Sequence, residues 1–179
     1  MVDASPFANN GTAHGVALAD GRAGRKALHL QGDGYIEVPK SQSLNPARRA
    51  WTVELTAKPE KPEGVLLARG GRTQGYALWL KASRPAFTVV ANNEPVTVEA
   101  PQPVEDWAVL AGAITADRHV QLRVNGRLVA TAPLRDFIGN DPNDAMQIGA
   151  DLGSPVVEPA PPKFTGLIES VRIYSGEKE

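Results

Sequence analysis

The chain has 179 residues, a net charge of −1 at neutral pH and no cysteine. This length suits one large β domain, and the near balance of 19 basic and 20 acidic residues argues against nucleic acid as a partner. The lack of cysteine excludes disulfides, thiolate zinc sites and cysteine nucleophiles. No stretch approaches the ~20 apolar residues that span a bilayer, and the residues after Met1 show no signal-peptide pattern.

The hydrophobic pattern repeats every two residues, which predicts strands rather than helices. Trp51–Lys58 and Val120–Val124 both alternate in this way, and two strand edges flank a Gly32-Asp33-Gly34 turn. Asn125-Gly126 predicts a two-residue hairpin, because both central residues of a type I′ turn need positive φ. In chain order the expected strands are 14–18, 27–31, 34–39, 51–58, 64–69, 75–81, 86–91, 95–100, 107–115, 119–125, 127–132, 146–150 and 164–174.

Helical signals are confined to single turns, expected around Ser41–Leu44 or Leu134–Phe137. The Pro-rich segment 151–163 is interpreted as a long surface loop, with a role in binding as the alternative. Short strands at this spacing predict an all-β fold, a two-sheet antiparallel β-sandwich with ~12–14 strands.

Several short segments occur in an order that resembles a known family. They are Asp3–Thr12, Gly24–Gly32, Trp51–Pro59, Gly75–Leu80, Trp107–Ala113, Val120–Ala130 and Phe164–Tyr174. Together they are similar to the successive strand motifs of laminin-G-like, concanavalin A-like jelly-roll domains. The resemblance covers nearly the whole chain, so we expect one domain over residues 1–179. It implies two curved antiparallel sheets, in a module of the kind attached to larger secreted hydrolases, sulfatases or adhesins, and hence an extracellular or periplasmic location.

Catalysis is not expected. Glucanases of this fold need paired carboxylates on one strand face, in an E-x-D-x-E spacing that the sequence lacks. Glu94 and Glu99 are five residues apart, so they cannot share a strand face, and Glu105-Asp106 precedes the strand that starts at Trp107. The three histidines share no metal-binding spacing.

A structural calcium ion is the cofactor that the resemblance implies. Domains of this family often bind Ca²⁺ through acidic residues of the opening motif and the closing strand, and the matching positions are Asp3 and Glu169, with Asn9 as a further oxygen ligand. The alternative is that Asp3 is an ordinary turn residue and Glu169 faces solvent or pairs with an arginine. The acidic segment 140–144 lacks the glycine and distal glutamate of a calcium loop and is expected to be a plain turn.

Trp79 is the candidate platform for a sugar. Leu78 and Leu80 share one strand face, so Trp79 is expected on the outer face unless a loop such as 151–163 covers it, whereas Trp51 and Trp107 are expected to anchor the core. Loop residues near this strand complete the predicted ligand set, and their guanidinium groups suit a sulfated or acidic glycan: Arg69, Arg72, Gln74, Arg84 and Asn92.

The sequence thus predicts a non-catalytic carbohydrate-binding or accessory module of a larger secreted bacterial enzyme. Its expected partner is a polysaccharide or glycan, and the isolated domain is expected to be a monomer. The alternatives are a structural or protein-interaction module without a sugar site and, third, a glycoside hydrolase. Fold alone cannot choose among them, because one sandwich architecture hosts many functions.

Overall fold

A computed structural model describes residues 1–176, and most of its regular structure is strand. The helical elements of the described part are two short 3-10 turns, η1 (Arg22–Gly24) and η2 (Gln42–Leu44). The strands are β1 (Thr12–Asp20), β2 (Lys26–Val38), β3 (Trp51–Pro59), β4 (Gly64–Gly70), β5 (Gly75–Lys81), β6 (Arg84–Ala91), β7 (Glu94–Glu99), β8 (Ala108–Ile114), β9 (His119–Val124), β10 (Arg127–Pro133), β11 (Met146–Ile148) and β12 (Thr165–Ser175).

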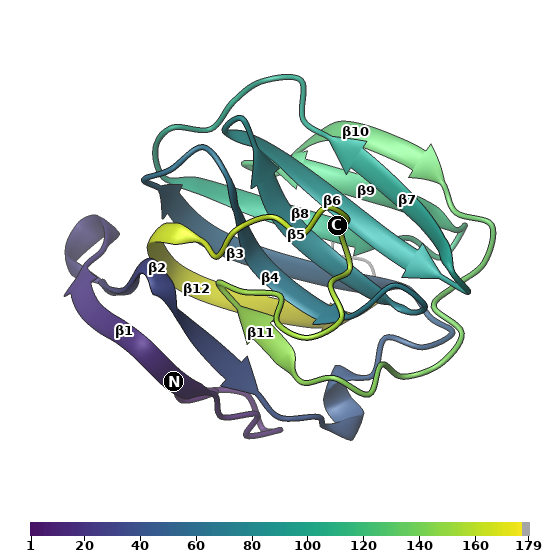
Figure 1. Cartoon of the computed structure of the whole chain (residues 1–179), viewed down its shortest axis with the longest axis horizontal. Coiled ribbons are helices and arrows are strands. Elements are labelled where there is room, and N and C mark those ends of the chain that lie inside the picture. The colour runs from purple at the N-terminus through teal and green to yellow at the C-terminus, as the bar shows by residue number, and fades with distance from the viewer. Residues whose placement is uncertain (177–179) are drawn as a thin grey trace.

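The strands form two layers joined through β2 (Figure 1). Residues 28–31 of β2 pair with β12, whereas residues 36–38 pair with β11. One layer therefore has the order β10-β9-β8-β3-β12, and the other has the order β11-β4-β5-β6-β7. The layers face each other where β7 meets β9 and β10. All the strand pairs are antiparallel, so the predicted two-sheet sandwich of jelly-roll type is confirmed.

The core lies between the layers and is built from alternate residues of the facing strands. Trp51, Tyr76, Phe87 and Phe164 are its largest buried aromatic side chains, so the prediction that Trp51 anchors the core is confirmed. Gly112 of β8 gives Phe87 its space, because a Cβ atom at position 112 would lie 2.3 Å from the ring. A glycine in the middle of a strand often marks such a close approach.

The Asn125-Gly126 hairpin is confirmed. Arg127 pairs with Val124, so two residues connect β9 to β10. Asn125 has a φ of 51° and Gly126 a φ of 79°, the two positive values that a type I′ turn requires.

The first hairpin differs from the prediction. The chain passes through Gly32, with a φ of 91°, without turning, so the two strands expected at 27–31 and 34–39 are one long strand. A Cβ atom on Gly34 would lie 2.4 Å from the carbonyl oxygen of Gly15 in β1. These glycines therefore allow an irregular, close-packed strand pair, which local sequence cannot distinguish from a turn.

One of the two expected helical turns is present. η2 falls within Ser41–Leu44, but Leu134–Phe137 is not helical. There the backbone N–H of Leu134 donates to the carbonyl oxygen of Arg118 at 2.8 Å, which ties this segment to the turn before β9. Among the described residues, no helix has the length and apolar character needed to cross a membrane.

Candidate functional site

Strand β5 places Trp79 on the outer face of its layer. Leu78 and Leu80 are fully buried between the layers, so Trp79 lies on the opposite face, where it is partly exposed. Its indole Nε1 donates a hydrogen bond to Thr88 Oγ1 at 3.0 Å, and Thr88 shares a second hydrogen bond, of 2.8 Å, with Thr97. These contacts hold the ring against the sheet and leave part of it open to solvent.

Segment 151–163 lies across the same face instead of standing away from the fold. Figure 1 shows this yellow-green segment, between β11 and β12, crossing in front of β4 and β5. Val156 and Val157 are buried in an apolar cluster on the outside of the layer, and Trp79 packs against that cluster. The remaining members are Val65, Ala68, Ala77 and Val90. Trp79 thus packs against an apolar cluster to which the segment contributes two valines.

Asp151 fastens the start of this segment. Its Oδ2 accepts a hydrogen bond from the backbone N–H of Val156 at 2.8 Å. Burial raises the pKa of Asp151 to about 6; the hydrogen bond from Val156 opposes this rise and the negative charge of Asp144 adds to it. The attachment of the covering segment therefore includes a carboxyl that titrates just below neutral pH.

The cross-strand register gives Trp79 charged neighbours. Trp79 lies opposite Ala86, and Ala86 lies opposite Glu99, so these side chains form one row across β5, β6 and β7. Arg84 Nη2 is 2.6 Å from Glu99 Oε1, and Lys81 lies directly opposite Arg84. We call Trp79, Lys81, Arg84 and Glu99 the Trp79 surface. Its two cations and one carboxylate give it a net charge of +1.

The structure separates most of the other predicted ligand residues from Trp79. Gln74 and Asn92 lie in the β4–β5 and β6–β7 turns, at the far end of the strands from Arg84, and Gln74 Nε2 donates to Asn92 Oδ1 at 2.7 Å. Arg72, in the first of these turns, forms an ion pair with Glu158 of the covering segment. Trp79 and Arg84 are therefore grouped together, and Gln74 and Asn92 form a second group.

Arg69 does not belong to the solvent-facing surface that we predicted for it. Its side chain is 0% exposed, and Nη2 lies 2.8 Å from Asp141 Oδ1. The guanidinium also donates to the carbonyl oxygens of Leu44, Pro142 and Asp144. Strand β4 is buried along its whole length. The Arg69 side chain therefore lies inside the fold, where its hydrogen bonds stabilise the 141–144 turn.

The structure does not bring Asp3 and Glu169 together. Asp3 accepts hydrogen bonds from the N–H and Oγ of Ser5, at 2.9 and 2.6 Å, and from the N–H of Asn9 at 2.8 Å, while the Asn9 side chain donates to Ser43 at 2.9 Å. This loop precedes β1, whereas Glu169 lies beyond the other end of that strand, beside η1. Nine extended residues separate the two sites by roughly 25 Å.

Two arginines form ion pairs with the carboxylate of Glu169, whose side chain is 3% exposed. Oε2 accepts a hydrogen bond from the backbone N–H of Arg22 at 2.9 Å, and Oε1 lies 3.3 Å from Arg25 Nε. Burial alone would raise the pKa of Glu169, but the hydrogen bonds from Arg22 and the charges of both arginines lower it overall. These residues do not fit a calcium ion, because guanidinium groups already neutralise the carboxylate. In the part of the chain that is described, no cluster of three or more His, Asp or Glu side chains could hold a metal.

Trp107 is not the core anchor that we predicted. It is partly exposed, and the Arg22 guanidinium lies 5.6 Å from its ring centroid. Sequence reasoning also missed two members of the Trp79 surface. Lys81 could have been found, since it is two residues from Trp79 on the same strand face. Glu99 could not, because its position depends on the pairing of β5, β6 and β7.

Comparisons with known sequences agree with this architecture. The profile of the concanavalin A-like lectin/glucanases superfamily, a laminin G family, matches residues 30–179. Among curated protein sequences, none matches the chain.

Solved structures with this fold include the binding domain of a mosquitocidal protein, a domain of an arabinanase and two laminin domains. The binding domain of Paraclostridial Mosquitocidal Protein 1 has a TM-score of 0.79 at 16% identity, over 99% of this chain and 47% of that one. Domain 4 of AbnA, an extracellular arabinanase of Geobacillus stearothermophilus solved with arabinotriose, has a TM-score of 0.69 at 20% identity, over 95% of this chain and 84% of that one. Domains LG4-5 of the mouse laminin α1 chain have a TM-score of 0.67 at 16% identity, over 82% of this chain and 40% of that one. The likeness concerns the fold alone, and this chain spans about half the length of the mosquitocidal binding domain.

Proposed function

This chain belongs to the concanavalin A-like lectin/glucanases superfamily, and from that premise we propose that it is a non-catalytic glycan-binding module whose ligand contacts the Trp79 surface. The observation that carries the proposal is a partly exposed indole on the outer face of a sheet, with an ion pair in the same cross-strand region. Carbohydrate sites combine an apolar platform with a few placed polar groups. Trp79 supplies the platform, and Lys81, Arg84 and Glu99 supply the polar groups.

The charges of the surface favour an acidic or sulfated glycan. Arg84 and Lys81 are adjacent and outnumber the single carboxylate of Glu99. Arg84 is 41% exposed and Glu99 is 31% exposed, so the pair is open to exchange with a ligand at little cost. A sulfate or carboxylate can take the place of Glu99 on the Arg84 guanidinium, which suits planar oxyanions.

The Trp79 surface lacks, among the described residues, the pair of carboxylates that hydrolysis of a glycoside needs, which favours a non-catalytic module. Glu99 belongs to the row of Trp79, but Glu94 lies at the other end of β7 and on its opposite face. A glycoside hydrolase would need a second carboxyl about 5–10 Å from Glu99, across a bound sugar.

We further propose that the module acts outside the cell and within a larger enzyme. Support comes from the arabinanase domain, which is one domain of an extracellular enzyme and of which this chain covers 84%. The bound arabinotriose of that domain agrees with a sugar ligand for this fold, although the identity of 20% carries no residue-level correspondence.

A protein-interaction module is the second candidate, and strand β1 favours it. Among the strands of the described part, β1 pairs with β2 alone, and nearly all its residues are exposed. Leu18 on this strand is 76% exposed, and Phe7 just before it is 65% exposed. An unpaired strand edge with apolar side chains is a docking place for another strand.

Affinity electrophoresis tests the glycan proposal. Gels containing a sulfated, a carboxylated or a neutral polysaccharide are run with wild type, Trp79→Ala and the matched control Trp107→Ala. We expect the sulfated or carboxylated polymer to retard wild type and Trp107→Ala, and Trp79→Ala to run as in an empty gel. Retardation of Trp79→Ala equal to that of wild type would exclude the Trp79 surface as the glycan-binding site. Equal melting curves establish that the variants are folded.

A further inference from the structure

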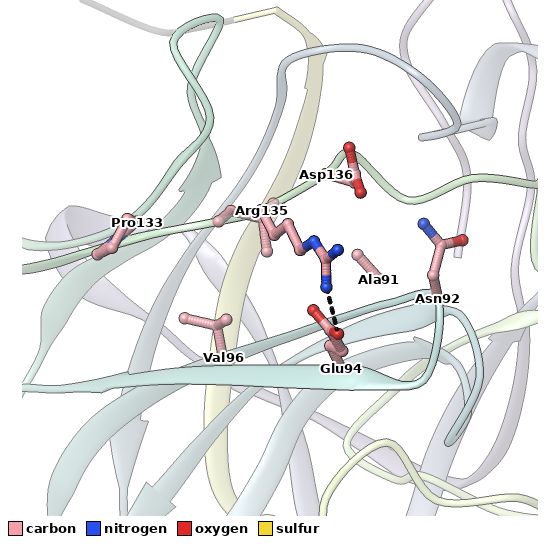
Figure 2. A pocket seen from close by; sticks show the side chains of 8 residues that line it. Ala91, Asn92, Glu94, Val96, Pro133, Arg135 and Asp136 are labelled. Atoms are coloured by element: carbon pink, nitrogen blue, oxygen red, sulfur yellow. Dashed lines mark hydrogen bonds and ion pairs between the residues drawn. The ribbon is translucent and has the colours of Figure 1, made fainter.

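A small pocket opens at the rim of the sandwich, where the edges of the two layers meet. It has a volume of about 260 Å³ and lies between the β6–β7 turn and the segment that follows β10. Figure 2 shows Arg135 reaching from that segment toward Glu94, with Asn92 to one side and Val96 and Pro133 to the other. The lining is completed by Ala91, Leu134 and Asp136. We call this the rim pocket.

Both walls of the rim pocket are held in place by hydrogen bonds outside it. On one side, Asn92 has a φ of 53°, and Gln74 Nε2 fixes its side-chain oxygen at 2.7 Å. On the other side, the Leu134 N–H donates to the carbonyl oxygen of Arg118 at 2.8 Å, and Arg118 Nη1 donates to the carbonyl oxygen of Arg135 at 3.0 Å. A ligand therefore meets a site whose backbone is already ordered, which lowers the entropic cost of binding.

The lining of the rim pocket carries one cation, Arg135, and two carboxylates, Glu94 and Asp136, and all three side chains are exposed. Arg135 Nη1 lies 3.1 Å from Glu94 Oε1, with the two side chains 78% and 58% exposed. Asp136 lies 3.9 Å from Arg118 Nη1. An exposed ion pair contributes little to folding stability, so the groups can turn to a ligand. Because Arg135 and the neighbouring Arg118 each already face a carboxylate, and the lining itself has more carboxylates than cations, an anionic ligand would meet at least as much repulsion as attraction here.

The remaining surface suits the two kinds of group on a sugar ring. A hydroxyl both donates and accepts hydrogen bonds, which matches an arginine and an amide beside carboxylates. Val96, Pro133 and Leu134 supply an apolar wall for ring C–H groups. The volume lies below the ~300–1,000 Å³ of sites for drug-sized ligands, so the pocket admits one ring rather than the middle of a polymer.

We propose that the rim pocket is a second ligand site, which binds a single neutral sugar ring such as the end of a glycan chain. The inference rests on the proposed function as a glycan-binding module, but it concerns a different place and a different ligand. Glu94 and Glu99 mark the two ends of β7, so the rim pocket and the Trp79 surface are roughly 17 Å apart. The Trp79 surface takes an acidic segment, and the rim pocket takes an uncharged end.

Methyl-selective NMR titration tests the rim pocket. The ligands are the methyl glycosides of arabinose, galactose and glucose, with glucuronate as the acidic counterpart. We expect at least one neutral glycoside to shift the Val96 and Leu134 methyl signals saturably. Arg135→Met should weaken that binding by about ten- to hundredfold, the loss expected for a hydrogen bond to a charged group. Arg127→Met is the matched control, because Arg127 lies at the opposite end of β10.

The outcomes separate this inference from the proposed function. The rim pocket is supported if neutral-glycoside binding keeps its affinity in Trp79→Ala and Arg127→Met but weakens by about ten- to hundredfold in Arg135→Met, whatever the polysaccharide gels show. The inference is overturned if no neutral glycoside shifts these methyl groups, if Arg135→Met binds the glycoside as tightly as wild type, or if glucuronate binds more tightly than the neutral sugars. An unfolded Arg135→Met would be recognised from its amide spectrum, and Glu94→Gln then serves as the second variant, with the same expected loss.

Discussion

Removing the Asp141 carboxylate tests the role assigned to Arg69. In Asp141→Ala the guanidinium, which is 0% exposed, loses the carboxylate of its ion pair and keeps neutral partners, among them the carbonyl oxygens of Leu44, Pro142 and Asp144. Breaking one side of a buried ion pair costs about 3–5 kcal/mol. For a chain of 179 residues each kcal/mol corresponds to about 2–4 °C, so the melting temperature should fall by about 6–20 °C.

Two further variants show whether the loss comes from the unpaired charge. Lys40 Nζ lies 3.2 Å from Asp141 Oδ2, but the lysine side chain is 44% exposed, so Lys40→Ala should cost less than about 1 kcal/mol. The double variant Arg69→Met with Asp141→Ala removes both buried charges and should be more stable than Asp141→Ala alone. Urea unfolding followed by tryptophan fluorescence measures all three. A free energy of unfolding for Asp141→Ala within about 1 kcal/mol of that for Lys40→Ala would contradict the role assigned to Arg69.

Two other predictions concern pH and calcium. Because the native pKa of Asp151 is raised to about 6 from its usual 3.8, the native state takes up the proton first as pH falls. Wild type should then gain stability relative to Asp151→Asn between pH 7 and pH 4, by at most about 3 kcal/mol and by roughly 1–2 kcal/mol after solvent screening. Urea unfolding of both proteins at pH 7 and pH 4 measures this difference. If the unfolding midpoints of wild type and Asp151→Asn shifted equally between the two pH values, the prediction would be contradicted. Because Arg22 and Arg25 already neutralise Glu169, neither millimolar Ca²⁺ nor a chelator should move the melting temperature, and a rise with Ca²⁺ would contradict the assignment.

Local patterns predicted the parts of the fold that local physics decides. The alternation along β5 correctly placed Trp79 on the outer face, and Asn125-Gly126 correctly placed the β9–β10 hairpin. Both features depend on the two-residue period of a strand or on the φ values of a turn, which neighbouring residues determine. The turn predicted at Gly32 and Gly34 was wrong, because glycine occurs both in turns and where two strands approach closely.

Features that depend on distant segments could not be predicted in this way. Arg69 has an ordinary position in its strand, but the 141–144 turn covers it, and no pattern near residue 69 indicates that turn. The apolar cluster beside Trp79 includes Val156 and Val157, two apolar residues within a Pro-rich loop. Asp3 and Glu169 were paired through the family resemblance, whereas the length of β1 keeps them at opposite ends of the strand.

A structure of the domain with a bound sulfated or uronic-acid oligosaccharide tests the central claim most directly. The account predicts a sugar ring on the exposed part of the Trp79 indole, with a sulfate or carboxylate on Arg84 and Glu99 displaced from that guanidinium. An ordered oligosaccharide elsewhere on the sandwich, with the Arg84–Glu99 pair intact and no sugar on the exposed part of Trp79, would contradict it.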